Sequence, residues 1–154
     1  MSTKTYQTQV TQFIQAKREK VFAAWTSVEH IKNWFAPGAM TVAHAECDPR
    51  VGGHYVVHMD GRCLTNVQDE SQKKLHKLSG VYKEIIPNEK LVFTWGSESE
   101  DRVETLVTIE FKDLNNGTNV ILTHERFITV ESAEQHNAGW HGCLDKLNHY
   151  IATL

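Results

Sequence analysis

The last two dozen residues constrain the fold most, since they predict one long helix that needs a surface to cover. The run from Glu131 to Leu154 contains no proline, and its apolar residues recur at the three-and-four spacing of a helix buried along one side. These residues are Ala133, Trp140, Cys143, Leu144, Leu147, Tyr150 and Ile151. At 1.5 Å per residue the helix would be roughly 35 Å long, enough to cross a small sheet. The functional question therefore concerns what lies beneath this helix.

The sequence before this helix predicts two short helices and a series of strands. Alternating residues from Tyr6 to Gln15 predict a first strand. Apolar residues at helical spacing follow from Lys17 to Thr26, and Ser27 is expected to cap a second short helix that continues to Trp34. Pro37-Gly38 is expected to end it. Further strands are predicted over residues 40–47, 54–60, 75–86, 90–95, 102–113 and 118–127.

Turn residues separate these strands. Gly52 and Gly53 predict a tight turn or bulge with positive φ, and Asn115-Asn116-Gly117 predicts a hairpin turn. The polar segment Gly61 to Lys74 is expected to form a long, mobile hairpin tip. The order of elements predicts an α+β domain covering residues 1–154: a curved antiparallel sheet of about six to seven strands on a long C-terminal helix, with two short helices after the first strand.

Composition excludes several classes of partner. The 154 residues carry a formal net charge of -3, so neither nucleic acid nor an anionic membrane surface is expected as a partner. No apolar run approaches the ~20 residues that span a bilayer, and the first residues show no signal peptide. Cys47, Cys63 and Cys143 are odd in number and contain no CxxC pair, which favours free thiols in a reducing cytoplasm.

Strand alternation predicts which side chains lie under the helix. Phe93 and Trp95 share one face with Leu91, and the strands that follow place Val107, Ile109, Phe111, Val120, Leu122 and His124 on the same side. The candidate lining of a cavity is Trp25, Tyr55, Met59, Tyr82, Phe93, Trp95, His124, His136, Trp140 and Leu144. A cavity of this kind suits a small apolar or aromatic ligand, with indole N–H groups as donors. The other interpretation is a filled core with no room for a ligand.

His124 is compatible with two roles. An inward histidine near His136 or Trp140 could bind a polar group of a ligand or act as a general acid or base. It could equally be a core histidine bonded to a backbone carbonyl, to Glu125 or to Tyr82.

Neither a metal site nor a catalytic motif is predicted. His136 and His141 point about 140° apart on a helix, and His54 and His58 lie ~13 Å apart along a strand. The sequence contains no GxSxG, P-loop, dinucleotide-binding or HExxH motif. No cofactor is expected, no catalytic residue is assigned, and nothing in the sequence requires an enzyme.

Five stretches of the sequence together resemble a known family. They are residues 21–37, with Val21-Phe22-Ala23-Ala24-Trp25 and Trp34-Phe35; Asp48 to Tyr55 with Met59; Gly80 to Trp95; Thr105 to Phe111 with Gly117-Thr118 and Leu122-Thr123-His124; and His136 to Trp140 with Leu144 and Leu147. They resemble the bacterial single-domain proteins related to the C-terminal domain of the activator of the heat-shock protein 90 ATPase, within the START-like (Bet v 1-like, polyketide cyclase-like, SRPBCC) superfamily.

This resemblance implies a helix-grip fold whose cavity often holds an apolar ligand. The superfamily includes lipid carriers, hormone receptors, aromatic cyclases and cochaperone domains, so the fold alone does not choose a function. The alternatives to ligand binding are a chaperone-associated stress protein and, less favoured, a cyclase-like enzyme. The eukaryotic cochaperone has a further N-terminal domain that this chain is too short to contain, which argues against a chaperone partner. Exposed sheet edges would also permit a homodimer.

Overall fold

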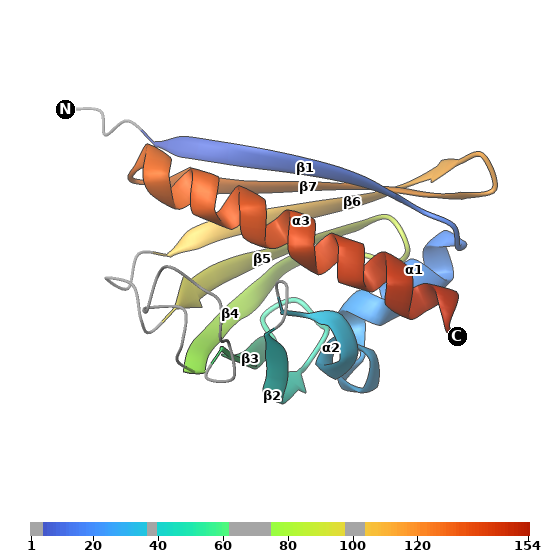
Figure 1. Cartoon of the computed structure of the whole chain (residues 1–154), viewed down its shortest axis with the longest axis horizontal. Coiled ribbons are helices and arrows are strands. Elements are labelled where there is room, and N and C mark those ends of the chain that lie inside the picture. The colour runs from blue at the N-terminus through green and yellow to red at the C-terminus, as the bar shows by residue number, and fades with distance from the viewer. Residues whose placement is uncertain (1–4, 37–39, 62–74, 98–103) are drawn as a thin grey trace.

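The computed structural model describes residues 5–36, 40–61, 75–97 and 104–154, and their arrangement confirms the α+β class (Figure 1). The strands are β1 (Tyr6–Ile14), β2 (Thr41–Cys47), β3 (His54–Asp60), β4 (Leu75–Ile86), β5 (Lys90–Ser97), β6 (Thr105–Leu114) and β7 (Gly117–Phe127). The helices are α1 (Arg18–Thr26), α2 (Val28–Trp34) and α3 (Val130–Ala152). Each one lies within a few residues of its predicted position.

All seven strands form one antiparallel sheet in the order β1-β7-β6-β5-β4-β3-β2. From β2 to β7 each strand pairs with the next one along the chain, and β1 joins the far edge beside β7. Figure 1 shows α3 crossing one face of the sheet, with its C-terminal end beside the α1–α2 pair. Helix α3 contacts β1 and β7, whereas α2 packs on β2 at the opposite edge. This is the predicted helix-grip arrangement.

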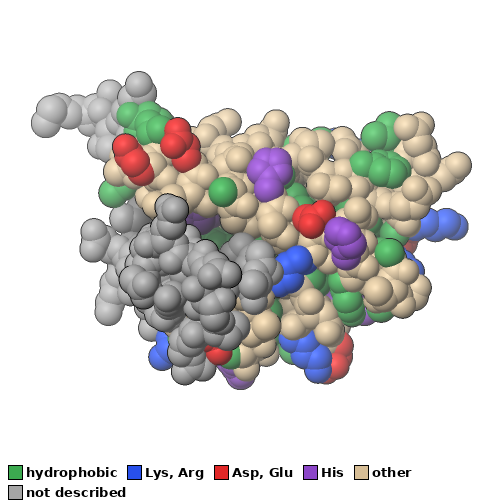
Figure 2. Space-filling view, viewed as in Figure 1, with side chains coloured by type: hydrophobic (Ala, Val, Ile, Leu, Met, Phe, Trp, Pro, Cys, Tyr) green, Lys and Arg blue, Asp and Glu red, His purple; other side chains and the backbone are tan. Residues whose placement is uncertain are grey.

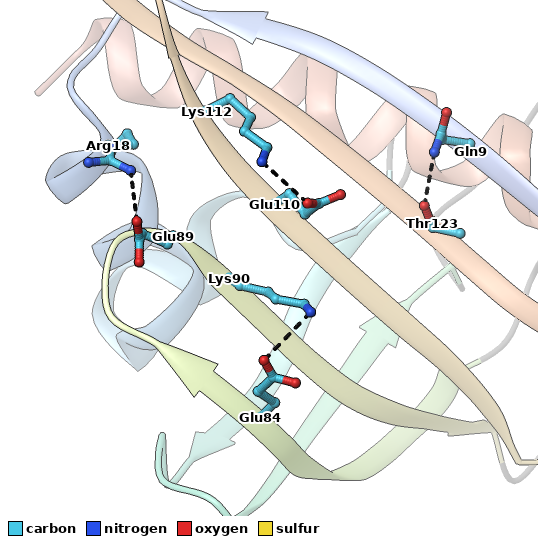
Figure 3. A network of polar contacts seen from close by, with 8 residues as sticks. All are labelled: Gln9, Arg18, Glu84, Glu89, Lys90, Glu110, Lys112 and Thr123. Carbon is cyan, nitrogen blue, oxygen red and sulfur yellow. Dashed lines mark hydrogen bonds and ion pairs between the residues drawn. The ribbon is translucent and has the colours of Figure 1, made fainter.

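The two faces of the sheet differ in polarity, as the alternation predicts. The face toward α3 is apolar, and its buried residues include Leu91, Phe93, Trp95, Val107, Ile109, Phe111, Val120 and Leu122. The other face carries ion pairs such as Lys90–Glu84 and Lys112–Glu110, both at 3.5 Å (Figure 3). Exposed pairs of this kind contribute only about 0–1 kcal/mol each, so burial on the inner face stabilises the sheet.

Helix α3 buries the predicted stripe. Its N-cap is Thr129, whose hydroxyl oxygen accepts a hydrogen bond from the Ser132 backbone N–H at 3.1 Å. Its buried residues are Ala133, Trp140, Cys143, Leu144, Leu147 and Ile151. Among the described residues, none of the helices has the length and apolar content needed to cross a membrane.

The turns agree with the sequence in part. Asn115 and Asn116 both have positive φ, 47° and 63°, and connect β6 to β7 directly because Leu114 pairs with Gly117. Ser27 does occupy the N-cap of α2, but its side chain makes no capping hydrogen bond, so that prediction was wrong. The expected helix stop at Pro37-Gly38 lies outside the described residues, and so does the hairpin tip expected over Gly61 to Lys74, except for Gly61 itself.

A bulge near the end of β7 changes which side chains face inward. Tyr6 pairs with Phe127 and Thr8 pairs with His124, so β7 has one extra residue at this point. Arg126 occupies it with φ of 76°, a left-handed conformation that is uncommon for a bulky residue. As a result both His124 and Phe127 are buried, although they lie three residues apart on one strand.

Candidate functional site

An apolar cavity lies between the inner face of the sheet and the α1–α2 pair. Its volume is about 10 Å³, close to the space that one water molecule needs. It is lined by Trp25, Ile31, Phe35, Tyr55, Val57, Tyr82 and Phe93. Among the described residues, no charged side chain lines this cavity. A cavity that holds benzene measures about 150 Å³, so a ligand of that size would require the lining side chains to move.

Three adjacent strands supply the sheet wall of the cavity. Tyr82 on β4 pairs with Phe93 on β5, and their ring centroids are 6.1 Å apart. Tyr55 on β3 lies 5.7 Å from the Tyr82 ring and 5.3 Å from the Phe93 ring. Tyr55 stands opposite Gly80, and this glycine lets the phenol cross β4 to donate a 2.6 Å hydrogen bond to the Thr94 carbonyl.

The helix pair supplies the other wall. Trp25 comes from the last turn of α1, and Phe35 follows directly after α2. The Trp25 ring lies 4.6 Å from the Trp34 ring and 5.7 Å from the Phe35 ring. Trp34 Nε1–H donates to the Ala24 carbonyl at 3.0 Å, which fixes α2 against α1. Aromatic contacts therefore hold both helices against the cavity.

The polar groups of the two tyrosines at the cavity are engaged with protein partners. The Tyr82 hydroxyl lies 3.0 Å from Cys47 Sγ, and this thiol is 3.5 Å from the Thr26 carbonyl oxygen. Burial raises the pKa of Tyr55, Tyr82 and the Cys47 thiol above their ordinary values. All three groups are therefore protonated at neutral pH, which makes Cys47 a poor nucleophile.

Trp25 differs from these tyrosines in its hydrogen bonding. Its side chain is 3% exposed, and its Nε1 atom is buried without a hydrogen-bond partner among the described residues. A buried donor without an acceptor costs about 1–3 kcal/mol. The cavity wall therefore contains one unsatisfied N–H group.

A second group of residues surrounds His124 next to the cavity. Trp140 Nε1 lies 3.0 Å from His124 Nδ1, and Thr105 Oγ1 lies 2.6 Å from His124 Nε2. An indole nitrogen can only donate, so Nδ1 is the acceptor and Nε2 carries the proton of a neutral ring. The Thr105 hydroxyl then donates to the Trp95 carbonyl at 3.2 Å. Both nitrogens of His124 are thus occupied by protein groups.

This environment keeps His124 uncharged. Burial, followed by the neighbouring His136, lowers the pKa of His124 to about 2. Protonation of His124 Nδ1 would also place its new N–H group against the N–H group of Trp140, so that a donor would face a donor. A general base needs a free, near-neutral nitrogen within reach of a substrate, so this geometry gives His124 the core role rather than the catalytic one. Its partners are Thr105 and Trp140, not Glu125, Tyr82 or a backbone carbonyl.

The structure places eight of the ten predicted site residues in two neighbouring groups. Those that line the cavity are Trp25, Tyr55, Tyr82 and Phe93. Those around the histidine are Trp95, His124, His136 and Trp140, with ring separations of 4.9 Å for Trp95–Trp140 and 5.1 Å for His124–His136. Leu144 is fully buried in the core, and Met59 is partly buried against it. Trp25, 6.1 Å from Trp140, connects the two groups. Whether they bind a ligand stays a prediction.

The candidate set did not include Ile31, Val57 and Phe35, although the sequence did predict Val57, with Tyr55 and Met59, at the edge of the concave wall. Val57 shares a strand face with Tyr55, so alternation alone was enough to include it. Phe35 could not be found that way, because it lies in the irregular backbone after α2 and faces inward only through the packing of that helix.

Histidines and cysteines form no obvious metal centre in the described part of the chain. No group of three or more His, Cys, Asp or Glu side chains there could hold a metal ion. Strand pairing does place His44 opposite His58, with ring centroids 5.2 Å apart. The sequence analysis did not find this pair, because it compared His58 only with His54 on the same strand. Cys47 and Cys143 are free thiols, and burial raises the pKa of Cys143 to about 12.

The surface over α3 shows mixed chemistry. On the described part of the face in Figure 2, hydrophobic, acidic, basic and histidine side chains are scattered rather than gathered by kind.

Comparisons with known proteins agree with this fold. The family described as Activator of Hsp90 ATPase homolog 1-like protein matches residues 15–152. A crystal structure of a protein from Chromobacterium violaceum is similar with a TM-score of 0.80 and 20% identity, covering 94% of this chain and 96% of that one. The AHSA1 protein from Silicibacter pomeroyi is similar with a TM-score of 0.79 and 21% identity, covering 96% and 99%. A search of curated protein sequences found no match.

Proposed function

Since the chain belongs to the Activator of Hsp90 ATPase homolog 1-like family, we propose that it binds a small, neutral, largely apolar or aromatic ligand between the sheet and its helices. Folds of this type commonly bind hydrophobic ligands. The observation that carries the proposal is the lining of the cavity, which is aromatic or aliphatic throughout and comes from three strands and two helices. Such a concave, uncharged surface suits an apolar molecule.

The small volume of the cavity limits the affinity expected for a ligand and means that side chains must move to admit one. A ligand that loses about 200 Å² of apolar surface gains at most about 5 kcal/mol, which corresponds to a Kd on the order of 0.1 mM. The ligand must also separate side chains that are in contact without it. Trp25 and Phe35 are the side chains expected to move, because they lie in α1 and directly after α2 rather than in the continuous sheet.

The test is a titration with the neutral fluorescent probe N-phenyl-1-naphthylamine, combined with native mass spectrometry of the purified protein. Val57→Phe adds a ring inside the cavity and should weaken probe binding at least about tenfold through steric exclusion. Val56→Phe is the matched control, because Val56 is the neighbouring residue on β3 and is not part of the cavity lining. It should leave the affinity within about twofold.

Two results would argue against the proposal. One is equal binding by both variants, which would place the probe elsewhere on the protein. The other is the absence of probe binding together with a mass spectrum free of any co-purifying molecule. A co-purifying mass of a few hundred daltons, lost on denaturation, would support it.

The geometry does not favour the cyclase alternative, since His124 has no free nitrogen to offer a substrate. A chaperone partner and a homodimer stay predictions.

A further inference from the structure

We propose that the ligand of this site carries a neutral oxygen acceptor, of the ketone or ether kind, and that Trp25 Nε1–H donates to it. The inference rests on the proposed function and adds to it the chemical class of the ligand. The buried tryptophans differ in the hydrogen bonding of their indole N–H groups. Trp34 Nε1–H donates to the Ala24 carbonyl and Trp140 Nε1–H donates to His124, each at 3.0 Å. Trp25 Nε1 is equally buried but has no acceptor among the described residues.

The position of Trp25 indicates where an acceptor for its unpaired N–H group could come from. Its indole is part of the cavity lining, together with the sheet residues Tyr55, Tyr82 and Phe93. A buried N–H normally has a partner, and an indole N–H can only donate. The described lining residues offer no free carboxylate, amide or imidazole to accept from it. The acceptor is therefore expected on a molecule that enters the cavity.

The acceptor should be neutral. In the described part of the chain no Lys, Arg or His side chain lines the cavity, so these residues offer no counter-charge to a buried carboxylate or phosphate. The other polar groups are already engaged, because the Tyr55 hydroxyl donates to the Thr94 carbonyl and the Tyr82 hydroxyl bonds with Cys47. One donor in an aromatic site matches an apolar ligand with one oxygen acceptor. A single water molecule is the competing acceptor, since the volume of about 10 Å³ would also admit it.

The experiment compares two probes that differ in one functional group. 1-Indanone and indane share a bicyclic skeleton, but only indanone has a carbonyl oxygen. Each is titrated into ¹⁵N-labelled full-length protein while the indole N–H signals are followed by NMR, with the Trp25 signal assigned from the Trp25→Phe variant. Indanone should move the Trp25 N–H proton downfield and bind about fivefold more tightly than indane, the effect expected of one hydrogen bond.

Trp25→Phe should remove this preference, leaving the two probes within about twofold of each other. Trp34→Phe is the control, because the N–H that it deletes already has the Ala24 carbonyl as its acceptor. A folded Trp34→Phe protein should keep the preference for indanone. The shift of the Trp25 signal in the unmodified protein provides a test that does not depend on either variant folding.

The possible results distinguish a failure of this inference from a failure of the proposed ligand binding. Equal affinities with no downfield movement of Trp25 would overturn the inference and leave ligand binding standing, with water as the acceptor. A response confined to another tryptophan would also overturn it. Failure of both probes to bind would count against the site itself.

Discussion

His124 shows how much a single side chain depends on its neighbours. It is fully buried, yet both its nitrogens have partners, and the donor-only indole of Trp140 determines which nitrogen carries the proton. Sequence analysis correctly predicted that His124 faces inward near Trp140. It did not identify Thr105, because the partners considered were Glu125 and Tyr82. The signal was present, since Thr105 shares the inward face of its strand with Val107.

The pH dependence of stability follows from this environment. The pKa of His124 is about 2 in the folded protein and about 6.5 in the unfolded chain. Below pH 6.5 the unfolded chain therefore takes up a proton that the folded protein does not, and stability falls as the pH falls. Between pH 7.5 and 4.5 this residue should cost about 2–3 kcal/mol of unfolding free energy. Urea unfolding at several pH values measures it.

His124→Gln provides the comparison, since an amide can also accept from Trp140 and donate to Thr105. Between pH 6.5 and 4.5 the unfolding free energy of the variant should depend on pH less steeply than that of the unmodified protein, by the uptake of about one proton. The carboxylates and exposed histidines contribute equally to both proteins. Parallel curves for the two proteins would contradict the assignment.

At the scale of elements, the inner face could be predicted because alternation is local. Leu91 to Trp95 and Val107 to Phe111 alternate without interruption, and both segments are buried as expected. The bulge at Arg126 could not be predicted, because a bulge depends on how β7 pairs with β1, more than a hundred residues earlier in the chain. It brings Phe127 within 4.3 Å of His124, ring centroid to ring centroid. Strict alternation would have placed Phe127 on the opposite face.

The junction of β4 and β5 depends on a glycine. A Cβ atom at Gly80 would lie 2.0 Å from the Thr94 carbonyl oxygen and 2.7 Å from a ring carbon of Tyr55. Gly80→Ala should therefore separate the two strands, disturb the Tyr55–Thr94 hydrogen bond, and destabilise the protein by about 1–3 kcal/mol or more. Chemical denaturation measures the loss.

Gly96, on the paired strand β5, is the matched control. A Cβ atom there would meet only the Ser79 carbonyl oxygen, at an ordinary 3.6 Å. Gly96→Ala should change the unfolding free energy by no more than about 1 kcal/mol, with either sign. A similar loss in both variants would show that strand glycines matter here for a reason other than close approach.

At the scale of the whole molecule, the helix pair and the sheet enclose an interior that is aromatic but tightly filled. The sequence was compatible both with a cavity and with a filled core, because side-chain types do not determine how much space remains between them. Trp25 and Tyr82 are far apart in the chain and meet only when α1 and α2 fold back over the sheet.

Enlarging the cavity should make ligand binding measurable. Phe93→Ala removes the ring at the centre of the sheet wall and should destabilise the protein by about 3–5 kcal/mol. Indane should then restore part of this loss by filling the space, raising the melting temperature with increasing concentration. Calorimetry with and without indane measures both effects.

Phe22→Ala is a suitable comparison for that experiment. Phe22 packs on Phe111, with ring centroids 5.5 Å apart, and is not part of the cavity lining. Indane should stabilise it no more than it stabilises the unmodified protein. Equal rescue of both variants would mean that the hydrocarbon enters any defect in the core.

The place of β1 at the edge of the sheet has a consequence for how the protein is made. Among the described residues, β1 pairs with β7 alone and contacts α3. During synthesis β7 and α3 leave the ribosome more than a hundred residues after β1. The strands from β2 to β6 can pair in the order in which they appear, whereas β1 must wait with its backbone groups exposed to solvent. The pairing of β1 with β7 therefore follows the pairing of the strands between them, and contacts of such long sequence separation are those that slow folding.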